Sequence, residues 1–133
     1  MSKNTAPSLF TALIRTHHIT SRKKVQRVRK AASQWALPFV LIRSGGAPGI
    51  MYAEGSCDGV TSWVNFVASL RYKDYRCLRR PALNEVLVPP PLIEKSFEEV
   101  ETTAEFARRM EERGLETWWR SAMDQKPGVI RDV

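Results

Sequence analysis

The stretch FVLIRSGGAPGIMYAEGSCDGVTSWVNFVASL, residues 39 to 70, decides the fold. Two apolar runs, Phe39 to Arg43 and Gly49 to Glu54, flank a segment rich in turn formers (44–48), and this spacing predicts a β-hairpin. Ser56 then provides an N-cap for a helix whose apolar residues recur at i, i+3, i+4, i+7 and i+10. These residues are Val60, Trp63, Val64, Val67 and Leu70. The stretch therefore predicts two adjacent strands followed by an amphipathic helix.

A strand and a basic helix are predicted upstream of the hairpin. Leu9 to Ile14 is an apolar run typical of a strand, and Arg15 to Ile19 is compatible with its continuation. Ser21 is a natural N-cap, and the helix after it ends near Trp35 because Pro38 cannot extend it. Its apolar stripe consists of Val25, Val28, Ala32 and Trp35. At 100° per residue, Lys23, Arg27 and Lys30 lie opposite this stripe, with Arg22, Lys24 and Arg29 at its flanks.

Downstream, Tyr75 to Arg80 is predicted as a short strand that Pro81 stops. The complete order is then β-α-β-β-α-β, the ferredoxin-like arrangement, in which two helices cover one face of a four-stranded antiparallel sheet. The fold class predicted is therefore α+β, a two-layer sandwich. The other face of the sheet must be covered or used for binding.

The rest of the chain is predicted to belong to the same structural domain. Residues 1–81 form the ferredoxin-like core, and residues 82–95 form a Pro-rich connection in which three consecutive prolines favour extended backbone. Residues 96–126 are expected to form a helical extension that packs on the core. Two helices are predicted within it, Thr103 to Glu112 and Glu116 to Met123, with Gly114 between them.

Charge is distributed unevenly over the 133 residues. The net charge is +7, but residues 1–81 contain 14 Lys and Arg against three acidic residues, whereas residues 82–133 contain 7 against 11. This polarity favours a polyanionic partner for the first part of the chain. No apolar run approaches the roughly 18 residues that span a bilayer, and the first ten residues lack the apolar core of a signal peptide. We therefore expect an intracellular protein without membrane contact, whose Cys57 and Cys77 are free thiols.

The sequence offers little support for catalysis or for a metal site. Consecutive strand residues point to opposite faces, so His17 and His18 are not expected to converge on one substrate. The chain has no CxxC, HxxxH, GxSxG, HExxH or Walker pattern, and the glycines at 45–49 enter a strand rather than a helix. Glu54 and Asp58 have no specific spacing. We therefore expect a protein that is not an enzyme and that has neither a cofactor nor a bound metal.

The basic residues are the strongest functional signal. Cationic side chains neutralise phosphates, and tyrosine rings stack on exposed bases, a combination suited to RNA recognition. The predicted nucleic-acid-binding residues are Lys23, Lys24, Arg27 and Lys30 on the basic helix, followed by Arg71, Lys73, Tyr75, Arg76 and Arg79. The alternative is that the basic helix face is only solvated.

Three motifs occur in an order that resembles a known family: HHITSRKK (17–24), GAPGIMYAEG (46–55) and SFEEVETTAEFARRMEERGLETWWRSAM (96–123). Together they resemble the carboxy-terminal domain of the spliceosomal pre-mRNA-processing factor Prp-three, a domain also found after RWD domains. The resemblance extends from Thr16 to Met123. Relatives commonly have Lys at the position of Ala47, so a phosphate contact from that turn is not expected here.

The resemblance implies a non-catalytic, ferredoxin-like RNA-binding domain in the nucleus. Its RNA would be a small nuclear RNA, as a duplex with an adjoining single strand, and its context would be a small nuclear ribonucleoprotein in mRNA splicing. The alternative function is that of the RWD-linked members, a protein-interaction module without a nucleic-acid role. In that case spliceosomal or other proteins would bind the Pro-rich and carboxy-terminal segments.

Overall fold

A computed structural model describes residues 9–84 and 96–124. In chain order the elements are β1 (Phe10–Thr16), α1 (Arg22–Gln34), β2 (Phe39–Arg43), β3 (Gly49–Gly55), α2 (Cys57–Ser69), β4 (Arg76–Leu83), β5 (Ser96–Val100), α3 (Thr103–Glu112) and α4 (Glu116–Met123). Most of the predicted Pro-rich connection (82–95) lies outside the described residues. The predicted hairpin and all four predicted helices are present.

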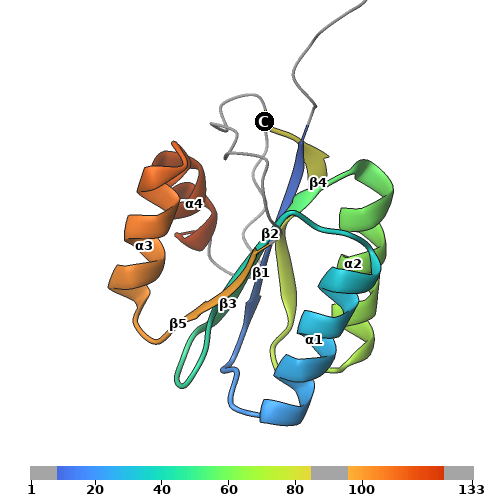
Figure 1. Cartoon of the computed structure of the whole chain (residues 1–133). Coiled ribbons are helices and arrows are strands. Elements are labelled where there is room, and N and C mark those ends of the chain that lie inside the picture. Colours follow the sequence, from blue (N-terminus) through green and yellow to red (C-terminus); the bar gives the residue numbers. More distant parts are fainter. Residues whose placement is uncertain (1–8, 85–95, 125–133) are drawn as a thin grey trace, which may run out of the picture.

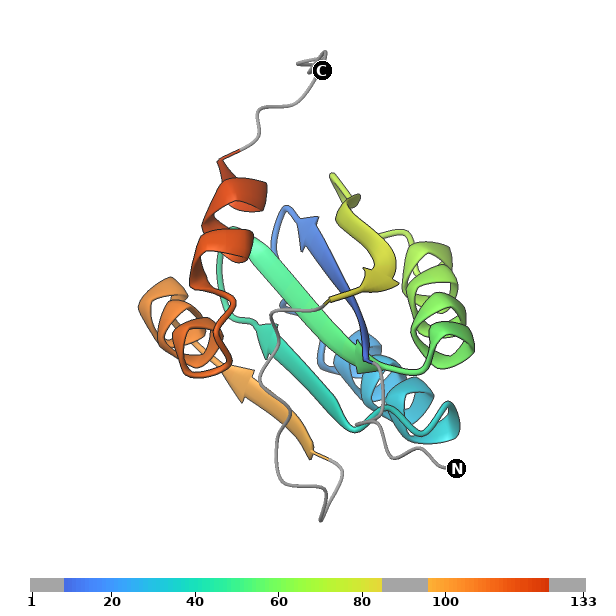
Figure 2. The same cartoon turned by 90° about the horizontal axis from the view of Figure 1, so that it is seen from above.

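The five strands form one sheet in the order β4-β1-β3-β2-β5. The first four pair antiparallel, and this is the strand order of a ferredoxin-like fold, so the predicted fold class is confirmed. Figures 1 and 2 show α1 and α2 on one face of the sheet and α3 and α4 on the other. The ferredoxin-like core has the two predicted layers, and the carboxy-terminal helices add a third, so the order of layers is helices, sheet and helices.

Strand β5 corrects the prediction that the segment from residue 96 onward is helical. Ser96–Val100 pairs parallel with β2, with Phe39 opposite Ser96 and Arg43 opposite Val100. Phe97 packs against the core under α1 and α2, and Val100 packs against the core under α3 and α4. This alternation is the period of a strand, but five residues that contain two glutamates are a weak signal.

Helices α1 and α2 are capped and packed as the sequence predicts. The Ser21 side chain accepts a hydrogen bond from the Lys24 backbone N–H, and Ser56 accepts one from Gly59. All five apolar residues predicted for the second helix are buried, and of the four predicted for the first helix only Trp35, the C-cap residue of α1, is half-buried. These side chains pack on the sheet residues Ala12, Ile14, Val40, Ile42, Met51 and Ala53.

Helices α3 and α4 cover the second face of the sheet. Phe106, Met110, Leu115, Trp119 and Ala122 pack on Leu13, Phe39, Leu41, Ile50 and Tyr52. The Thr102 side chain caps α3 in a capping box with Glu105. The sheet face that the sequence left open is therefore occupied by the chain's own carboxy-terminal helices.

Two local predictions need correction. Strand β4 does not stop at Pro81: it continues to Leu83, with Arg80 and Pro81 opposite the single residue Ala12 of β1. Proline fits there because β4 is an edge strand with a bulge at that point.

The second correction concerns the histidine pair. Strand β1 ends at Thr16, so His17 and His18 lie in the connection to α1. The prediction that their side chains point to opposite faces of a strand is therefore wrong, and the two ring centroids are 4.9 Å apart. Because the alternation of a strand ends at its last residue, it does not separate these two rings.

Candidate nucleic-acid interface

The outer face of α1 presents the predicted basic side chains to solvent. Lys23, Arg27 and Lys30 are exposed, whereas Val25 and Val28 on the opposite side of the helix are buried. No hydrogen bond or ion pair within the described part of the chain involves these three cationic side chains. They are therefore available to an anionic partner.

The connection between α2 and β4 lies beside the start of α1. The Lys24 ammonium is 4.8 Å from the centroid of the Tyr72 ring, and the His17 backbone N–H donates to the Lys73 carbonyl at 2.8 Å. Arg71 and Lys73 are exposed in this connection. The fold thus brings together two of the predicted basic groups, from α1 and from residues 71–73, although about fifty residues separate them in sequence.

Arg76 and Arg79 occupy different surroundings. Arg76 lies next to Arg15 of β1, its partner in the strand register, close to the basic connection. Arg79 lies further along β4, where its Nη2 donates to the Ser121 Oγ of α4 at 2.9 Å. Arg79 is therefore engaged with α4, apart from the other predicted binding residues.

The tyrosines present little ring surface for stacking. Tyr72 is buried, and Tyr75 is half-buried against the core under α1 and α2. Burial raises the pKa of each of these phenols to about 12. Stacking of RNA bases on these two rings, the role that the sequence suggests, is consequently restricted to the exposed part of Tyr75.

Two other cations of α1 attach the helix to β5. The Arg22 guanidinium donates to both carboxylate oxygens of Glu99, at 2.8 and 2.9 Å. The Arg29 guanidinium lies 4.7 Å from the centroid of the Phe97 ring. The hydrogen bond from Arg22 lowers the pKa of Glu99, with burial opposing it and Ser44 adding a second hydrogen bond. The basic run thus divides into cations that make no hydrogen bond or ion pair within the described residues and cations that contact β5.

Sequence reasoning missed a row of arginines across one end of the sheet. In the strand register Arg76 is opposite Arg15, Arg15 is opposite Ile50, and Ile50 is opposite Arg43. Arg43 is satisfied by the carbonyls of Pro48 and Glu101. Arg15 was not identified because only the pairing of β1 with β4 places it beside Arg76. A charged residue at the end of an otherwise apolar strand was the available signal.

A buried charged cluster fixes the helices on the second sheet face. Glu54 is fully buried; it accepts hydrogen bonds from Arg113 at 2.5 and 2.6 Å and from the Tyr52 hydroxyl at 2.7 Å. Burial acts to lower the pKa of Arg113, but the hydrogen bonds with Glu54 outweigh it and raise that pKa. Burial and the neighbouring Glu54 raise the pKa of Tyr52 well above its usual value.

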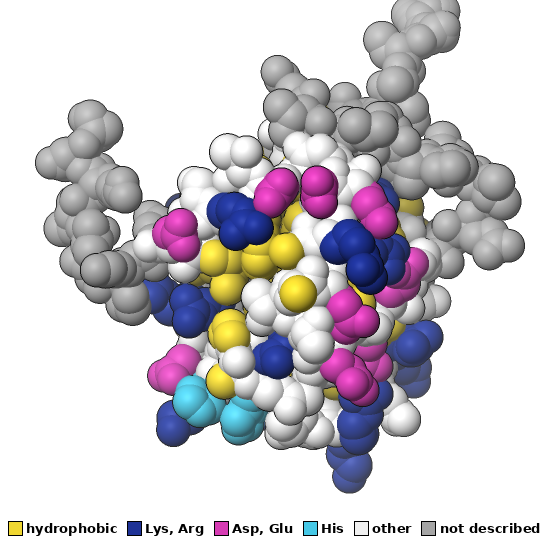
Figure 3. All heavy atoms as spheres, turned by 90° about the vertical axis from the view of Figure 1, so that its left-hand side faces the viewer, with side chains coloured by type: hydrophobic (Ala, Val, Ile, Leu, Met, Phe, Trp, Pro, Cys, Tyr) yellow, Lys and Arg dark blue, Asp and Glu magenta, His cyan; other side chains and the backbone are white. Residues whose placement is uncertain are grey.

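The α3 and α4 face has a mixed charge. Figure 3 shows acidic and basic side chains interspersed around apolar ones on this side of the molecule. Underneath, Leu13, Ile50 and Tyr52 of the central strands are buried by the two helices. The sheet therefore cannot serve as a stacking platform for RNA bases on this face.

Residues 9–84 and 96–124 contain no group of three His, Cys, Asp or Glu side chains arranged to hold a metal ion. None of the described helices has the length and apolar character required to cross a membrane.

The chain matches no protein-family model and no curated protein. Among solved structures, it is similar to a chain described as "BlrP1 BLUF", with a TM-score of 0.50 and 15% sequence identity. The alignment covers 96% of this chain and 82% of that chain. At this identity the likeness shows the fold alone, and it agrees with the ferredoxin-like arrangement of the sheet and helices.

Proposed function

We propose that this protein is a non-catalytic RNA-binding protein that contacts the phosphate backbone through a basic end of the molecule. We define the basic end as the exposed cations of α1 (Lys23, Arg27, Lys30), the neighbouring Lys24, Arg71 and Lys73 in the connection between α2 and β4, and Arg76 at the start of β4. The observation that carries the proposal is the contact between Lys24 and Tyr72, which joins the two groups. Arg79 is left out because it is bonded to α4.

The charge and burial of these side chains favour contact with the phosphate backbone of RNA over recognition of its bases. The exposed cations suit phosphates, while the second sheet face is covered and Tyr72 is buried. A cationic surface that neutralises four to six phosphates gives a slope of log K against log salt of about −3 to −5. The family resemblance makes a small nuclear RNA duplex with a single-stranded overhang the ligand we propose, and the nucleus the location.

The test is an electrophoretic-shift titration with such an RNA at several salt concentrations. Replacing Lys23, Arg27 and Lys30 by Ala is expected to weaken binding by about 10-fold or more and to make the salt slope shallower by about 2 to 3. The fold should persist because the three side chains are exposed. Unchanged affinity in the triple variant would exclude α1 as the contact surface.

A comparison of two variants with the same net charge tests whether RNA binding depends on α1 specifically or only on the total charge of the protein. R27A/K30A removes two positive charges from α1, and R108A/R120A removes two from exposed positions of α3 and α4. The proposal predicts a clearly larger loss of affinity for the first pair. If wild type binds no RNA, and a partner captured from nuclease-treated lysate is lost on changing α4, the protein-interaction function replaces the RNA proposal.

A further inference from the structure

A pocket of about 730 Å³ opens at the basic end, between the start of β4, the end of β1 and the β2–β3 turn. Its lining residues are Arg15, Thr16, His17, Ala47, Pro48, Asp74 and Arg76. The volume lies within the range of about 300 to 1,000 Å³ typical of small-ligand sites. A nucleotide-sized group therefore fits in it.

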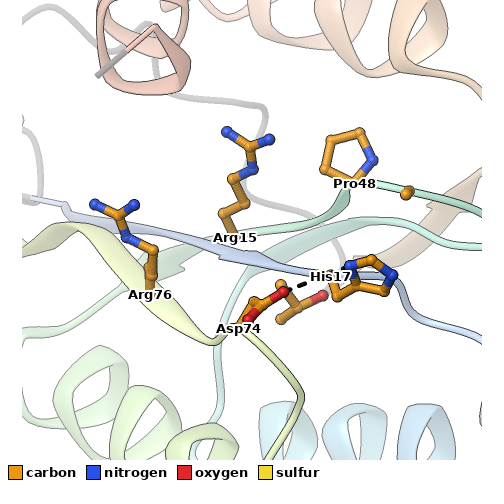
Figure 4. A pocket seen from close by; sticks show the side chains of 7 residues that line it. Arg15, His17, Pro48, Asp74 and Arg76 are labelled. Atoms are coloured by element: carbon orange, nitrogen blue, oxygen red, sulfur yellow. Dashed lines mark ion pairs between the residues drawn. The ribbon is translucent and has the colours of Figure 1, made fainter. Parts of the chain in front are cut away.

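Two arginines on paired strands dominate the charge of this pocket. Arg15 and Arg76 are opposite each other in the register of β1 and β4, and Figure 4 shows their side chains extending in the same direction. Within residues 9–84 and 96–124, neither guanidinium has a hydrogen-bond partner or a carboxylate oxygen within 4.0 Å. Two like charges side by side without a counterion are unfavourable, and an anion between them would remove that cost.

The other polar side chains of the pocket are already engaged. Asp74 Oδ2 is 3.5 Å from His17 Nδ1, an interaction marked in Figure 4, so this carboxylate is directed toward the histidine. The Thr16 hydroxyl donates to the His18 carbonyl at 3.2 Å. Ala47 and Pro48 add apolar surface beside the arginines. The free binding capacity of the pocket thus lies in its two guanidinium groups.

We infer that this pocket binds a terminal phosphate monoester, presented by the end of an RNA strand. A monoester carries a charge of about −1.5 to −2 at neutral pH, whereas a phosphodiester within a strand carries −1. Two guanidinium forks provide parallel N–H donors for the three terminal oxygens and match the dianion in charge. The inference deepens the proposed function and rests on it, because the pocket adjoins the RNA surface through His17 and Lys73.

The same chemistry has a second source, a free nucleoside monophosphate. Both sources present the same dianion to Arg15 and Arg76, and they differ in whether the α1 cations contribute. An RNA end should depend on the pocket and on α1, whereas a free nucleotide should depend on the pocket alone.

The experiment compares one overhang-bearing RNA duplex with 5′-phosphate, 3′-phosphate or hydroxyl ends, by fluorescence anisotropy in phosphate-free buffer. The wild type should bind one phosphorylated end about 10-fold more tightly than the hydroxyl end. R15Q, which leaves every residue of the basic end in place, should reduce that preference without weakening binding of the hydroxyl-ended RNA. R15Q/R76Q should abolish the preference, and it should weaken binding of the hydroxyl-ended RNA only by the single backbone contact of Arg76. K23A/R27A/K30A should weaken all three RNAs by a similar factor and retain the preference. R15K/R76K, which keeps both charges but removes the guanidinium forks, should show an intermediate preference. Thermal melting checks that each variant is folded.

Titration with adenosine monophosphate separates the remaining outcomes. Equal binding of all three RNAs would overturn the pocket inference and leave the proposed RNA function intact. If no RNA binds but adenosine monophosphate does, and R15Q/R76Q removes that binding, the phosphate pocket stands and the RNA function falls. If neither RNA nor nucleotide binds, both are overturned.

Discussion

The two helical layers cover opposite faces of one sheet, but different interactions attach them. Helices α1 and α2 rest mainly on apolar contacts, with one buried hydrogen bond between them, from the Trp63 indole to the Val28 carbonyl at 3.3 Å, and an exposed ion pair from Arg22 to Glu99. Helices α3 and α4 also have an apolar core, but a buried ion pair between Glu54 and Arg113 accompanies it. The first layer keeps its free cations outside, whereas the second places an arginine inside.

This difference shows how to assign a role to an arginine of a basic protein. Arg113 lies 4.1 Å from the Phe39 ring centroid and binds Glu54, so its charge serves the fold. Arg27 is exposed on α1, and no interaction within the described residues engages it. Counting cations along the sequence cannot separate these cases, because the distinction depends on the layer to which each residue belongs.

The largest effect is expected from Trp63→Ala in the first layer. Trp63 is fully buried, and its removal leaves a large cavity and eliminates the indole hydrogen bond to the Val28 carbonyl. We expect a loss of about 3 to 5 kcal/mol in the free energy of unfolding, measured by urea denaturation. The exposed Leu83→Ala is the control, with a change within about 0.5 kcal/mol. A Trp63→Ala protein as stable as this control would contradict an apolar attachment of α2.

A smaller effect is expected when the ion pair of the second layer is broken. Glu54→Ala leaves the Arg113 guanidinium and the Tyr52 hydroxyl without their partner. We expect a loss of about 2 to 4 kcal/mol, somewhat below the range for fully buried pairs because the Arg113 side chain is 13% exposed. Amide hydrogen exchange should accelerate most in α3 and α4.

A double variant isolates the cost of the unpaired charge. Glu54→Leu with Arg113→Met replaces both ions by apolar side chains and should recover much of the stability lost in Glu54→Ala, since an apolar pair avoids burying an uncompensated charge. A double variant less stable than Glu54→Ala would show that the layer depends on the ion pair itself.

The two helical layers also differ in how far the sequence predicts them. The periods of α1 and α2 identify their buried faces, and the bounds predicted for α3 and α4 match the observed helices. The placement of α3 and α4 depends instead on contacts such as Glu54 with Arg113, which are 59 residues apart. Strand β5 was missed because parallel pairing of Phe39 with Ser96 uses backbone groups, which leave little trace in side-chain pattern.

The candidate site likewise has one part that the sequence predicts and one part that depends on the tertiary fold. The exposed face of α1 follows from helical geometry and could be predicted residue by residue. The pocket between Arg15 and Arg76 required the register of β1 with β4, which is interrupted by two shifts. The association of Lys24 with Tyr72 likewise required the complete topology.

The smallest effect concerns the link between α1 and β5, and it depends on pH. The pKa of Glu99 is lowered from its ordinary value of 4.5, chiefly by the hydrogen bond from Arg22. A carboxylate with a lowered pKa in the folded state stabilises the fold above its unfolded pKa, and that contribution disappears as the pH falls through the lowered value. Solvent screening makes this effect smaller than those expected for Trp63→Ala and Glu54→Ala, because the Arg22 side chain is 64% exposed.

The measurement is the Tm of wild type and Glu99→Gln between pH 7 and pH 3. Above pH 4.5 the wild type should be the more stable, and the difference should shrink steadily at lower pH. A difference that is independent of pH would show that Glu99 acts through packing and its neutral hydrogen bond to Ser44 rather than through its charge.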